Sequence, residues 1–291
     1  MMASRFWKLG LLGERLGHSL SPSIHRAALK ACGLSGDYTL VETDAHGLAG
    51  WVQELRDAEI DGLNVTIPYK ESVLPLCDSL DPLAATVGAV NTLVRDGGLV
   101  RGYNTDVSGL EQALRGRWPD EPWQGQHVTV QGAGGAARAA IVALHRLGAG
   151  SIRIANRTHE RARLLAHELS DRLSMPISAP ADPIDAYRSS ALVIQASAMG
   201  LNHDDSDHVR EVAKVALAAT APDCVVMDLV YRPAKTCFVV AATECGRQAH
   251  GGLLMLIHQA RDAFALWTGR DAPVEQLLGA AQAARLREQS R

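Results

Sequence analysis

The pattern of hydrophobic and polar positions alternates along this chain between two forms. Short apolar runs are typical of buried strands, and an apolar repeat every three to four residues is typical of amphipathic helices. The short runs predict strands at 9–12, 38–42, 62–67, 128–130, 151–155, 192–196 and 224–229. The longer repeat predicts helices at 21–31, 46–56, 107–114, 159–173, 209–219, 253–267 and 274–287, and a helical stretch after Lys70. Residues 88–94 and 98–102 flank Asp96-Gly97-Gly98 and predict a hairpin. This succession predicts an α/β fold.

Residues 128–138 form the most informative segment, reading Val-Thr-Val-Gln-Gly-Ala-Gly-Gly-Ala-Ala-Arg. A β-branched strand leads into a glycine turn, and an alanine-rich helix follows and stops at Gly148. The N–H groups and the dipole of such a helix point at the same place, and a turn without Cβ atoms lets a pyrophosphate approach. Glycine also serves helix–strand packing, so the turn alone is a weak signal for nucleotide binding.

The next predicted strand, 151–155, ends in Asn156-Arg157-Thr158. Folds that select NAD usually carry an acidic residue at this point, which binds the ribose 2′-hydroxyl. Arg157 instead suits a 2′-phosphate, with Asn156 and Thr158 as hydrogen-bonding neighbours. The simpler interpretation makes Thr158 a helix cap and Arg157 a surface charge. The order of strand, turn, helix and strand favours NADP.

The composition mainly excludes classes of protein and kinds of site. The 291-residue chain has a net charge of −3 and no basic run interleaved with aromatics, which argues against a nucleic-acid partner. No apolar run of about 18 residues is free of breakers or polar residues, so no membrane span is expected, and the first residues lack the apolar core of a signal peptide. Five widely spaced cysteines without a Cys-x-x-Cys pair predict reduced thiols and a cytoplasmic location. His18 and His25 lack a third ligand at a suitable spacing, so no metal is expected.

Four short segments bring polar side chains to the ends of predicted elements in the first part of the chain: 17–22, 64–70, 88–92 and 102–106. Each has a structural explanation, because Ser21 or Asp106 suits a helix cap and Thr66 suits a strand. However, ligands of open α/β sheets collect at the carboxyl ends of the strands, where Thr66, Lys70 and Asn91 are predicted to lie. Taken together, the segments predict a substrate site.

Lys70 and Asp106 supply the chemistry for such a site. Oxidation of an alcohol by a nicotinamide cofactor requires a group that removes the hydroxyl proton as hydride leaves, and a lysine beside an aspartate can do so. Burial opposes the charged form of lysine whereas a neighbouring carboxylate favours it, so the sequence leaves the resting charge state open.

Eight motifs occur in one order between residue 11 and about residue 259. In the first part they are His-Ser-x-Ser-Pro at 18–22, Asn-Val-Thr-x-Pro-x-Lys at 64–70, Gly-Ala-Val-Asn-Thr at 88–92 and Asn-Thr-Asp at 104–106. In the second part they are Gly-Ala-Gly-Gly-Ala-Ala at 132–137, Asn-Arg-Thr at 156–158, Asp-x-x-Tyr-x-Pro at 228–233 and Met-Leu-Ile-x-Gln at 255–259. This set resembles the shikimate dehydrogenase family, and it is far more specific than the glycine turn alone.

The resemblance implies two α/β domains. A substrate-binding and catalytic domain would comprise residues 1–106, completed by C-terminal helices at 253–291, and residues 107–252 would form a Rossmann-type NADP-binding domain. The implied reaction is the NADP-dependent interconversion of shikimate and 3-dehydroshikimate, a step of aromatic amino-acid biosynthesis, with Lys70 as acid/base and Asp106 as its partner.

The resemblance also assigns the binding residues. Those around the substrate carboxylate would be Ser19, Ser21, Thr66 and Tyr231, and those on the ring hydroxyls would be Asn91 and Gln259. Those that bind NADP would be Gly132, Ala133, Gly134, Gly135, Ala136, Asn156, Arg157, Thr158, Leu229 and Gly252.

Four places depart from the family pattern. Gln195-Ala196-Ser197-Ala198-Met199-Gly200 stands where Asn-x-Thr-x-x-Gly is usual, Arg15 where proline is common, Gln131 where an apolar residue is common and Leu254 where glycine is frequent. These departures favour a divergent paralogue with altered cofactor affinity or substrate choice. Two alternatives stay open, namely a quinate/shikimate dehydrogenase of catabolism and an NADP-binding sensor without turnover. Both a monomer and a homodimer fit the sequence.

Overall fold

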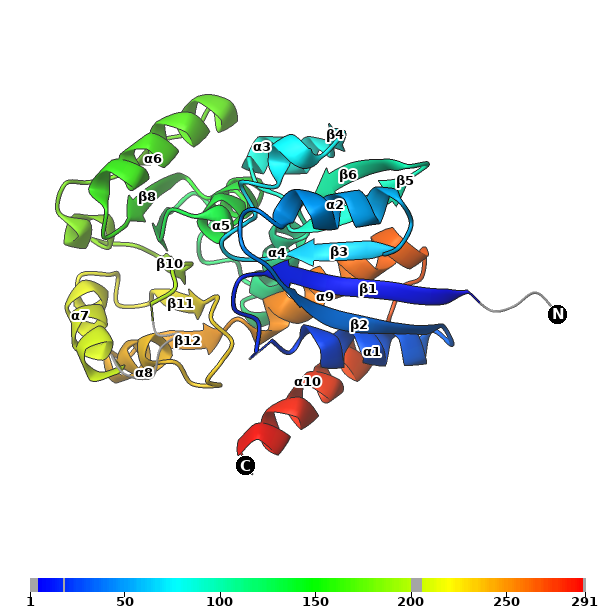
Figure 1. The fold of residues 1–291 in the computed structure, drawn as a ribbon. Helices are drawn as coiled ribbons and strands as arrows, with labels where there is room; N and C mark the ends of the chain where they lie inside the picture. The colour runs from blue at the N-terminus through cyan, green and yellow to red at the C-terminus, as the bar shows by residue number, and fades with distance from the viewer. Residues whose placement is uncertain (1–4, 18, 200–205, 290–291) are drawn as a thin grey trace. The chain divides into compact units, whose positions relative to one another are not determined.

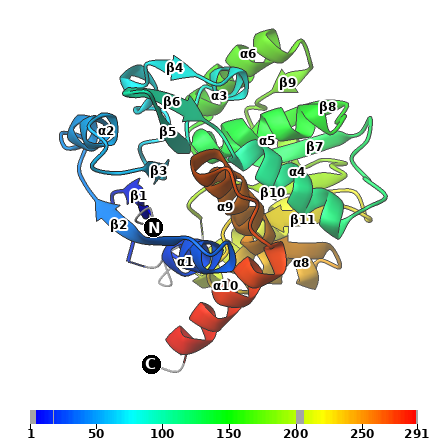
Figure 2. The same cartoon turned by 90° about the vertical axis from the view of Figure 1, so that its right-hand side faces the viewer.

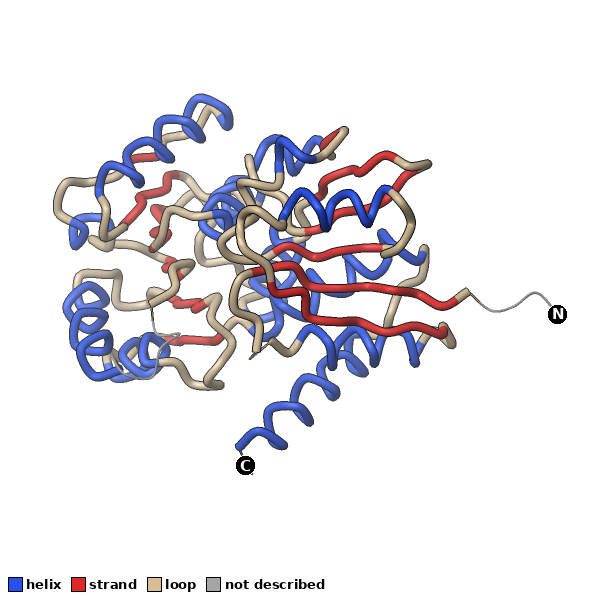
Figure 3. Tube along the Cα trace, in the orientation of Figure 1, coloured by secondary structure: helices blue, strands red, loops and turns tan. Residues whose placement is uncertain are grey.

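The computed structural model describes residues 5–17, 19–199 and 206–289, which divide into two compact units. The first unit runs to Gly109 and resumes at Ile257, and the second spans Leu110–Leu256. Each unit contains one six-stranded sheet with helices packed on it (Figure 1, Figure 3). The predicted α/β fold is therefore confirmed.

The N-terminal unit is built on a mixed sheet. In pairing order its strands are β2 (Ser35–Glu42), β1 (Phe6–Gly13), β3 (Gly62–Val65), β5 (Thr92–Asp96), β6 (Leu99–Tyr103) and β4 (Ser79–Leu80). Strand β1 is parallel to β2 and β3, whereas β5 is antiparallel to β3 and β6. The carboxyl ends of β1, β3 and β6 and the amino end of β5 consequently lie at the same edge of the sheet.

Helices α1 (Ser21–Ala31), α2 (Leu48–Arg56) and α3 (Pro82–Val87) contact strands of this sheet. The other helices are α4 (Asp106–Arg117), which begins at the end of this unit, α9 (Leu253–Thr268) and α10 (Val274–Gln289), which packs on α1. Helix α1 contacts β2 and lies beside α10, while α2 contacts β5 and β6 (Figure 2). The indole of Trp267 on α9 donates to the Leu93 carbonyl at 2.9 Å. The C-terminal helices thus return to the N-terminal unit, as expected.

The core beneath α1 is aromatic. The imidazole of His25 stacks on the ring of Tyr38 with the ring centroids 4.2 Å apart, and Trp267 and Phe264 lie 5.4 and 6.5 Å from His25. His25 is completely buried. This desolvation outweighs the nearby Asn64 side chain and lowers the pKa of His25 to about 3, so the ring is neutral.

The C-terminal unit is built on an all-parallel sheet. Its strands, in pairing order, are β12 (Gln248–Gly251), β11 (Val225–Asp228), β10 (Leu192–Gln195), β7 (His127–Gln131), β8 (Ser151–Ala155) and β9 (Ile177–Ser178). Its helices are α5 (Gly135–Arg146), α6 (His159–Leu173), α7 (Ser206–Ala218) and α8 (Cys237–Glu244). The strand order reverses between β7 and β10, and Rossmann folds bind their ligands at such a switch point.

Several elements differ from the prediction. The helical stretch expected after Lys70 is a series of turns with a 3-10 turn at Leu74–Leu76. Gly88 does not begin a strand but ends α3, with a φ of 69°. The sequence did not predict α3, α8, β4, β9 or β12. These elements are short, at two to eight residues, and too short to show a clear period. Within the described ranges, no helix is long and apolar enough to cross a membrane.

Candidate functional site

Lys70 and Asp106 meet at the shared edge of the first sheet. The Lys70 Nζ donates to the Asp106 Oδ2 at 2.6 Å, and their side chains are 14% and 6% exposed. Lys70 follows β3, and its carbonyl accepts the Val90 N–H at 2.7 Å. Asp106 is the first residue of α4, and its own N–H is bound by the Asn104 side chain at 3.1 Å. The role of helix cap falls to Asn104, which leaves the Asp106 carboxylate for Lys70.

Asn91 joins this pair from the start of β5. Its Nδ2 donates to the Asp106 Oδ1 and to the Thr105 hydroxyl, each at 2.9 Å, and the Gln259 Oε1 lies 3.5 Å from the same nitrogen. The Asn91 Oδ1 accepts the Thr105 N–H at 2.8 Å and the Thr92 hydroxyl at 3.0 Å. The structure therefore gathers Lys70, Asp106, Asn91 and Gln259, with the Asn91 amide bound by protein groups on both sides.

Thr66 follows strand β3, whereas Ser19 lies in the loop after β1 and Ser21 begins α1. The Thr66 N–H donates to the Leu12 carbonyl of β1 at 2.9 Å, which places the start of the β1–α1 loop beside Thr66. The Ser19 hydroxyl accepts the Ser21 N–H at 3.2 Å. Ser21 is the first residue of α1 and does not cap it, contrary to the structural explanation above. His18 of this motif lies outside the described residues.

The glycine turn of the C-terminal unit lies against the loop that follows β10. Gly132 has a φ of 120°, and a Cβ there would come within 3.0 Å of the Ala196 carbonyl group and the Ser197 nitrogen. Gly134 precedes α5, and no side chain caps this helix start. Ala133, Gly135 and Ala136 complete the turn. A narrow glycine cradle before an uncapped helix start fits a dinucleotide pyrophosphate.

The end of β8 presents basic and amide groups. Arg157 and Thr158 are exposed, and the Asn156 Nδ2 donates to the Thr158 carbonyl at 2.9 Å. Thr158 is the N-cap residue of α6, as the simpler interpretation expected, but its side chain makes no capping hydrogen bond. The sequence did not single out Arg161, whose Nη2 lies 3.5 Å from the Ala133 carbonyl of the glycine turn. A second arginine four residues after Arg157 is the signal that could have identified it.

Leu229 and Gly252 lie side by side at the ends of β11 and β12. A Cβ on Gly252 would come within 2.3 Å of the Leu229 carbonyl oxygen, so only glycine fits. Asp228 is fully buried and accepts hydrogen bonds from the Thr236 hydroxyl, the Val230 N–H and the Gln195 amide. Burial outweighs these donors and raises the pKa of Asp228 to about 7. Tyr231 follows this strand and belongs to the C-terminal unit.

Three family models match successive parts of the chain. They are the shikimate dehydrogenase substrate binding domain at residues 11–93, the shikimate / quinate 5-dehydrogenase at residues 119–216 and the shikimate 5'-dehydrogenase C-terminal domain at residues 252–282. The shikimate dehydrogenase (NADP(+)) of Methanothermobacter thermautotrophicus is 38% identical over 94% of this chain and 95% of its own. This chain belongs to the shikimate dehydrogenase family.

Solved structures of the family have the same fold. Shikimate 5-dehydrogenase from Thermus thermophilus, in complex with NADP(H) and shikimate, is 32% identical and matches 96% of this chain and 99% of its own with a TM-score of 0.80. Quinate dehydrogenase from Corynebacterium glutamicum, in complex with NAD, is 30% identical and matches 96% of this chain and 100% of its own with a TM-score of 0.82.

The structure accommodates the two glutamines that depart from the family pattern. The Gln195 Oε1 accepts the Ser197 N–H at 2.6 Å, and its Nε2 donates to the Met199 carbonyl at 3.1 Å, so this side chain spans the loop after β10. Gln131 accepts the hydroxyl of buried Tyr187 at 2.6 Å. Gly200 lies outside the described residues. Altered cofactor affinity stays a prediction.

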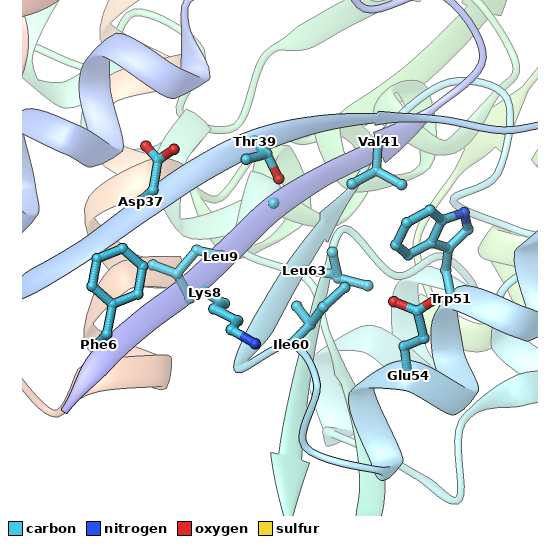
Figure 4. A pocket seen from close by; sticks show the side chains of 11 residues that line it. Phe6, Lys8, Leu9, Asp37, Thr39, Val41, Trp51, Glu54, Ile60 and Leu63 are labelled. Atoms are coloured by element: carbon cyan, nitrogen blue, oxygen red, sulfur yellow. The ribbon is translucent and has the colours of Figure 1, made fainter.

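A pocket on the N-terminal sheet contains none of the predicted site residues. The pocket shown in Figure 4 has a volume of about 380 Å³ and lies over β1, β2 and β3, beside Trp51 and Glu54 of α2. Phe6 and Lys8 border it on β1. Among the described residues, no group of three or more histidine, cysteine or acidic side chains is placed to hold a metal.

Proposed function

We propose that this chain is an NADP-dependent shikimate dehydrogenase, which interconverts shikimate and 3-dehydroshikimate. The observation that carries this function is the largely buried contact between Lys70 and Asp106, in a chain that matches a curated NADP-dependent relative over nearly its whole length. The N-terminal unit would bind the substrate, and the C-terminal unit would bind NADP.

Proton transfer is assigned to Lys70. When shikimate is oxidised, the carbon that carries the reacting hydroxyl loses a hydrogen with its electron pair, and bound NADP⁺ supplies the acceptor for this hydride. The hydroxyl proton passes to a neutral Lys70 Nζ as the carbon–oxygen double bond forms. Asp106, 2.6 Å away, stabilises the resulting ammonium, and the same proton returns when 3-dehydroshikimate is reduced.

Hydroxyl groups are assigned to the substrate carboxylate. Thr66 follows β3, and Ser19 and Ser21 lie in the loop after β1 and at the start of α1. The family resemblance also assigns Tyr231 to the carboxylate. Bonds from a hydroxyl to a carboxylate are short and strong. A site without arginine also keeps a second positive charge away from Lys70. Gln259 is assigned to a ring hydroxyl.

The C-terminal unit carries the features that NADP requires. The turn from Gly132 to Ala136 would hold the pyrophosphate, the backbone at Leu229 and Gly252 would lie near the nicotinamide, and the end of β8 would bind the 2′-phosphate through Asn156, Arg157 and Thr158. Arg161 adds a second guanidinium beside the turn. The lack of an acidic residue at positions 156–158 favours NADP over NAD.

Absorbance at 340 nm tests the function. The protein is offered shikimate or quinate, each with NADP or NAD, and the largest kcat/KM is expected for shikimate with NADP. A larger value for quinate with NAD, the pair named for the Corynebacterium relative, would assign the chain to the catabolic alternative. Bound NADP without reduction in any mixture would assign it to the sensor alternative, against which the retained Lys70–Asp106 pair argues.

The proposal extends to the cellular location and the oligomeric state of the protein. All five cysteines are unpaired, which is typical of a reducing compartment, and we infer a cytoplasmic location. A monomer or a homodimer is expected in solution, and light scattering distinguishes the two.

A further inference from the structure

We propose that Thr92 and Asn64 are positioning residues, which set the orientation of the Asp106 carboxylate through Asn91. In the described part of the chain, neither of them hydrogen-bonds to Lys70 or Asp106. The inference deepens the proposed function, because it rests on Lys70 and Asp106 as the acid–base pair.

The orientation of the Asn64 amide is dictated by the backbone. Asn64 is buried on β3, and its Nδ2 lies 3.1 Å from the Asn91 carbonyl, which can only accept. The second hydrogen of this nitrogen points at the Thr92 hydroxyl at 3.0 Å. The Asn64 Oδ1 must then accept from the Tyr38 hydroxyl, 2.9 Å away. The Tyr38 ring is held in turn by its stack on His25.

The Thr92 hydroxyl links the orientation of the Asn64 amide to that of the Asn91 amide. Because its hydroxyl oxygen accepts from Asn64, the hydroxyl hydrogen is free to donate to the Asn91 Oδ1 at 3.0 Å. The Thr105 N–H, which can only donate, reaches the same oxygen at 2.8 Å. The Thr105 hydroxyl also lies 3.2 Å from this oxygen. These donors fix the Asn91 amide with its oxygen turned away from Asp106 and its nitrogen turned toward it.

The carboxylate of Asp106 is thereby held on both sides. Its Oδ1 accepts from Asn91 at 2.9 Å, which leaves the Oδ2 for Lys70 at 2.6 Å. A flipped Asn91 amide would place a carbonyl oxygen against the carboxylate, which is repulsive. Loss of the Thr92 hydroxyl removes one of the donors that prevent this flip, and it leaves a buried N–H of Asn64 without an acceptor.

Substitutions at Thr92 test the inference. Valine fills the same space and suits a strand, so Thr92→Val should fold. We expect its kcat for shikimate to fall about tenfold, because the loss of one hydrogen bond raises the activation free energy by about 1.4 kcal/mol. The KM values for shikimate and for NADP should stay within twofold of wild type. Thr92→Ser keeps the hydroxyl and should restore kcat to within about twofold. A Thr92→Val protein with unchanged kcat, or with a loss confined to KM, would overturn the inference.

The matched control is Thr129→Val. Thr129 is equally buried on β7 of the other unit, and its hydroxyl donates to the Ala186 carbonyl at 2.6 Å and contacts Ser190 at 3.0 Å. This variant should lower Tm as Thr92→Val does but leave kcat unchanged. An equal loss of kcat in both variants would mean that any buried threonine hydroxyl matters only for folding, which also contradicts the inference.

Two further measurements isolate the route through the acid–base pair. In a Lys70→Ala background, Thr92→Val should lower the residual rate less than twofold, because the orientation it disturbs no longer serves a proton transfer. A full additional tenfold loss would contradict this route. The ¹³C chemical shift of the Asp106 carboxyl in the ligand-free protein should change in Thr92→Val and return in Thr92→Ser. This signal needs no turnover, so it tests the positioning even if shikimate proves not to be the substrate, and an unchanged chemical shift would refute it.

Discussion

The candidate site of the N-terminal unit is made of side chains, whereas that of the C-terminal unit is made mainly of backbone. In the N-terminal unit the site consists of side chains that bind one another, with Asn91 linking Asp106 to Thr92 and Thr105. In the C-terminal unit the surfaces assigned to NADP are backbone, kept open by glycines such as Gly132 and Gly252. The site in the N-terminal unit depends on which way each hydrogen-bonding atom faces. The surface in the C-terminal unit depends on the absence of Cβ atoms at its glycines. We therefore expect the first to fail when a polar atom is deleted and the second to fail when a methyl group is added.

Deletion of the Lys70 amine should have the largest effect. Lys70→Ala is expected to lower kcat by about 10²–10⁴-fold, the usual range for general acid–base catalysis, while KM for shikimate changes only a few-fold. Steady-state kinetics measure both values, and fluorescence titration should show unchanged NADP binding. A rise in KM that matches the fall in kcat would instead make Lys70 a ground-state binding residue.

Addition of a methyl group at Gly252 should affect the other site. Because the new Cβ would lie 2.3 Å from the Leu229 carbonyl oxygen, the backbone there must move. We expect Gly252→Ala to raise KM for NADP at least about tenfold and to destabilise the protein by about 1–3 kcal/mol. KM for shikimate should change much less.

Gly279→Ala is the control for this substitution. Gly279 lies within α10, where an added Cβ meets no atom within 4 Å, and the change should stabilise the protein by about 0.5–1 kcal/mol. Unchanged NADP kinetics in Gly252→Ala would show that this part of the backbone does not meet the cofactor.

A substitution at Ser19 tests the part of the N-terminal site that is assigned to the substrate carboxylate. Ser19→Ala removes a hydroxyl assigned to the substrate carboxylate, and it should raise KM for shikimate about tenfold while KM for NADP stays constant. Ser23→Ala, in the first turn of the helix α1 that follows Ser19, provides the comparison and should behave as wild type. If KM for shikimate is equal in the two variants, Ser19 does not bind the carboxylate.

The smallest expected effect is a difference between the two units in how their stability depends on pH. Burial lowers the pKa of His25 in the first unit from 6.5 to about 3, so its contribution to the free energy of unfolding is complete above pH 6.5 and falls as the pH falls toward 3. Burial raises the pKa of Asp228 in the second unit from 3.8 to about 7, so its contribution is complete below about pH 4 and is lost as the pH rises through 7. Acidification from pH 7 to 5 therefore weakens the first unit through His25 and strengthens the second through Asp228.

Hydrogen exchange measured peptide by peptide, and corrected for the intrinsic exchange rate, follows each unit between pH 5 and 7. Asp228→Asn removes the titrating group and should leave the second unit less strengthened by acid than in wild type. His25→Phe should leave the first unit less weakened. Identical pH dependence in wild type and both variants would mean that neither group titrates with the pKa given above.

The fold was largely predictable where elements are long and periodic. Strand β8 and helix α6 have the bounds that the sequence indicates. Helix α8, by contrast, reads Cys-Phe-Val-Val-Ala-Ala-Thr-Glu, and its apolar, β-branched composition shows no helical stripe. Strand β12, Gln-Ala-His-Gly, has no strand signal of its own and exists because it pairs in parallel with β11. Such elements are decided by tertiary contacts, which a local pattern does not contain.

The family resemblance named the candidate site residues but did not indicate how they connect. The resemblance to the family named Lys70 and Asp106 together, yet no spacing in the sequence places two residues from different elements within 2.6 Å of each other. Asn91 was expected on substrate hydroxyls, and the structure shows its amide already bound to Thr105, Thr92 and Asp106. Which partner an amide faces depends on neighbouring donors and acceptors, and only coordinates reveal these.

The seating of α9 on the N-terminal sheet has a consequence for synthesis of the protein. Trp267 and Phe264 lie against His25, and Trp267 lies against Tyr38, so this core cannot be completed on the ribosome until Trp267 has been made. The C-terminal unit is one uninterrupted stretch, Leu110–Leu256, and leaves the ribosome earlier. The C-terminal unit can therefore complete its fold during translation before the unit that contains Lys70 and Asp106 does.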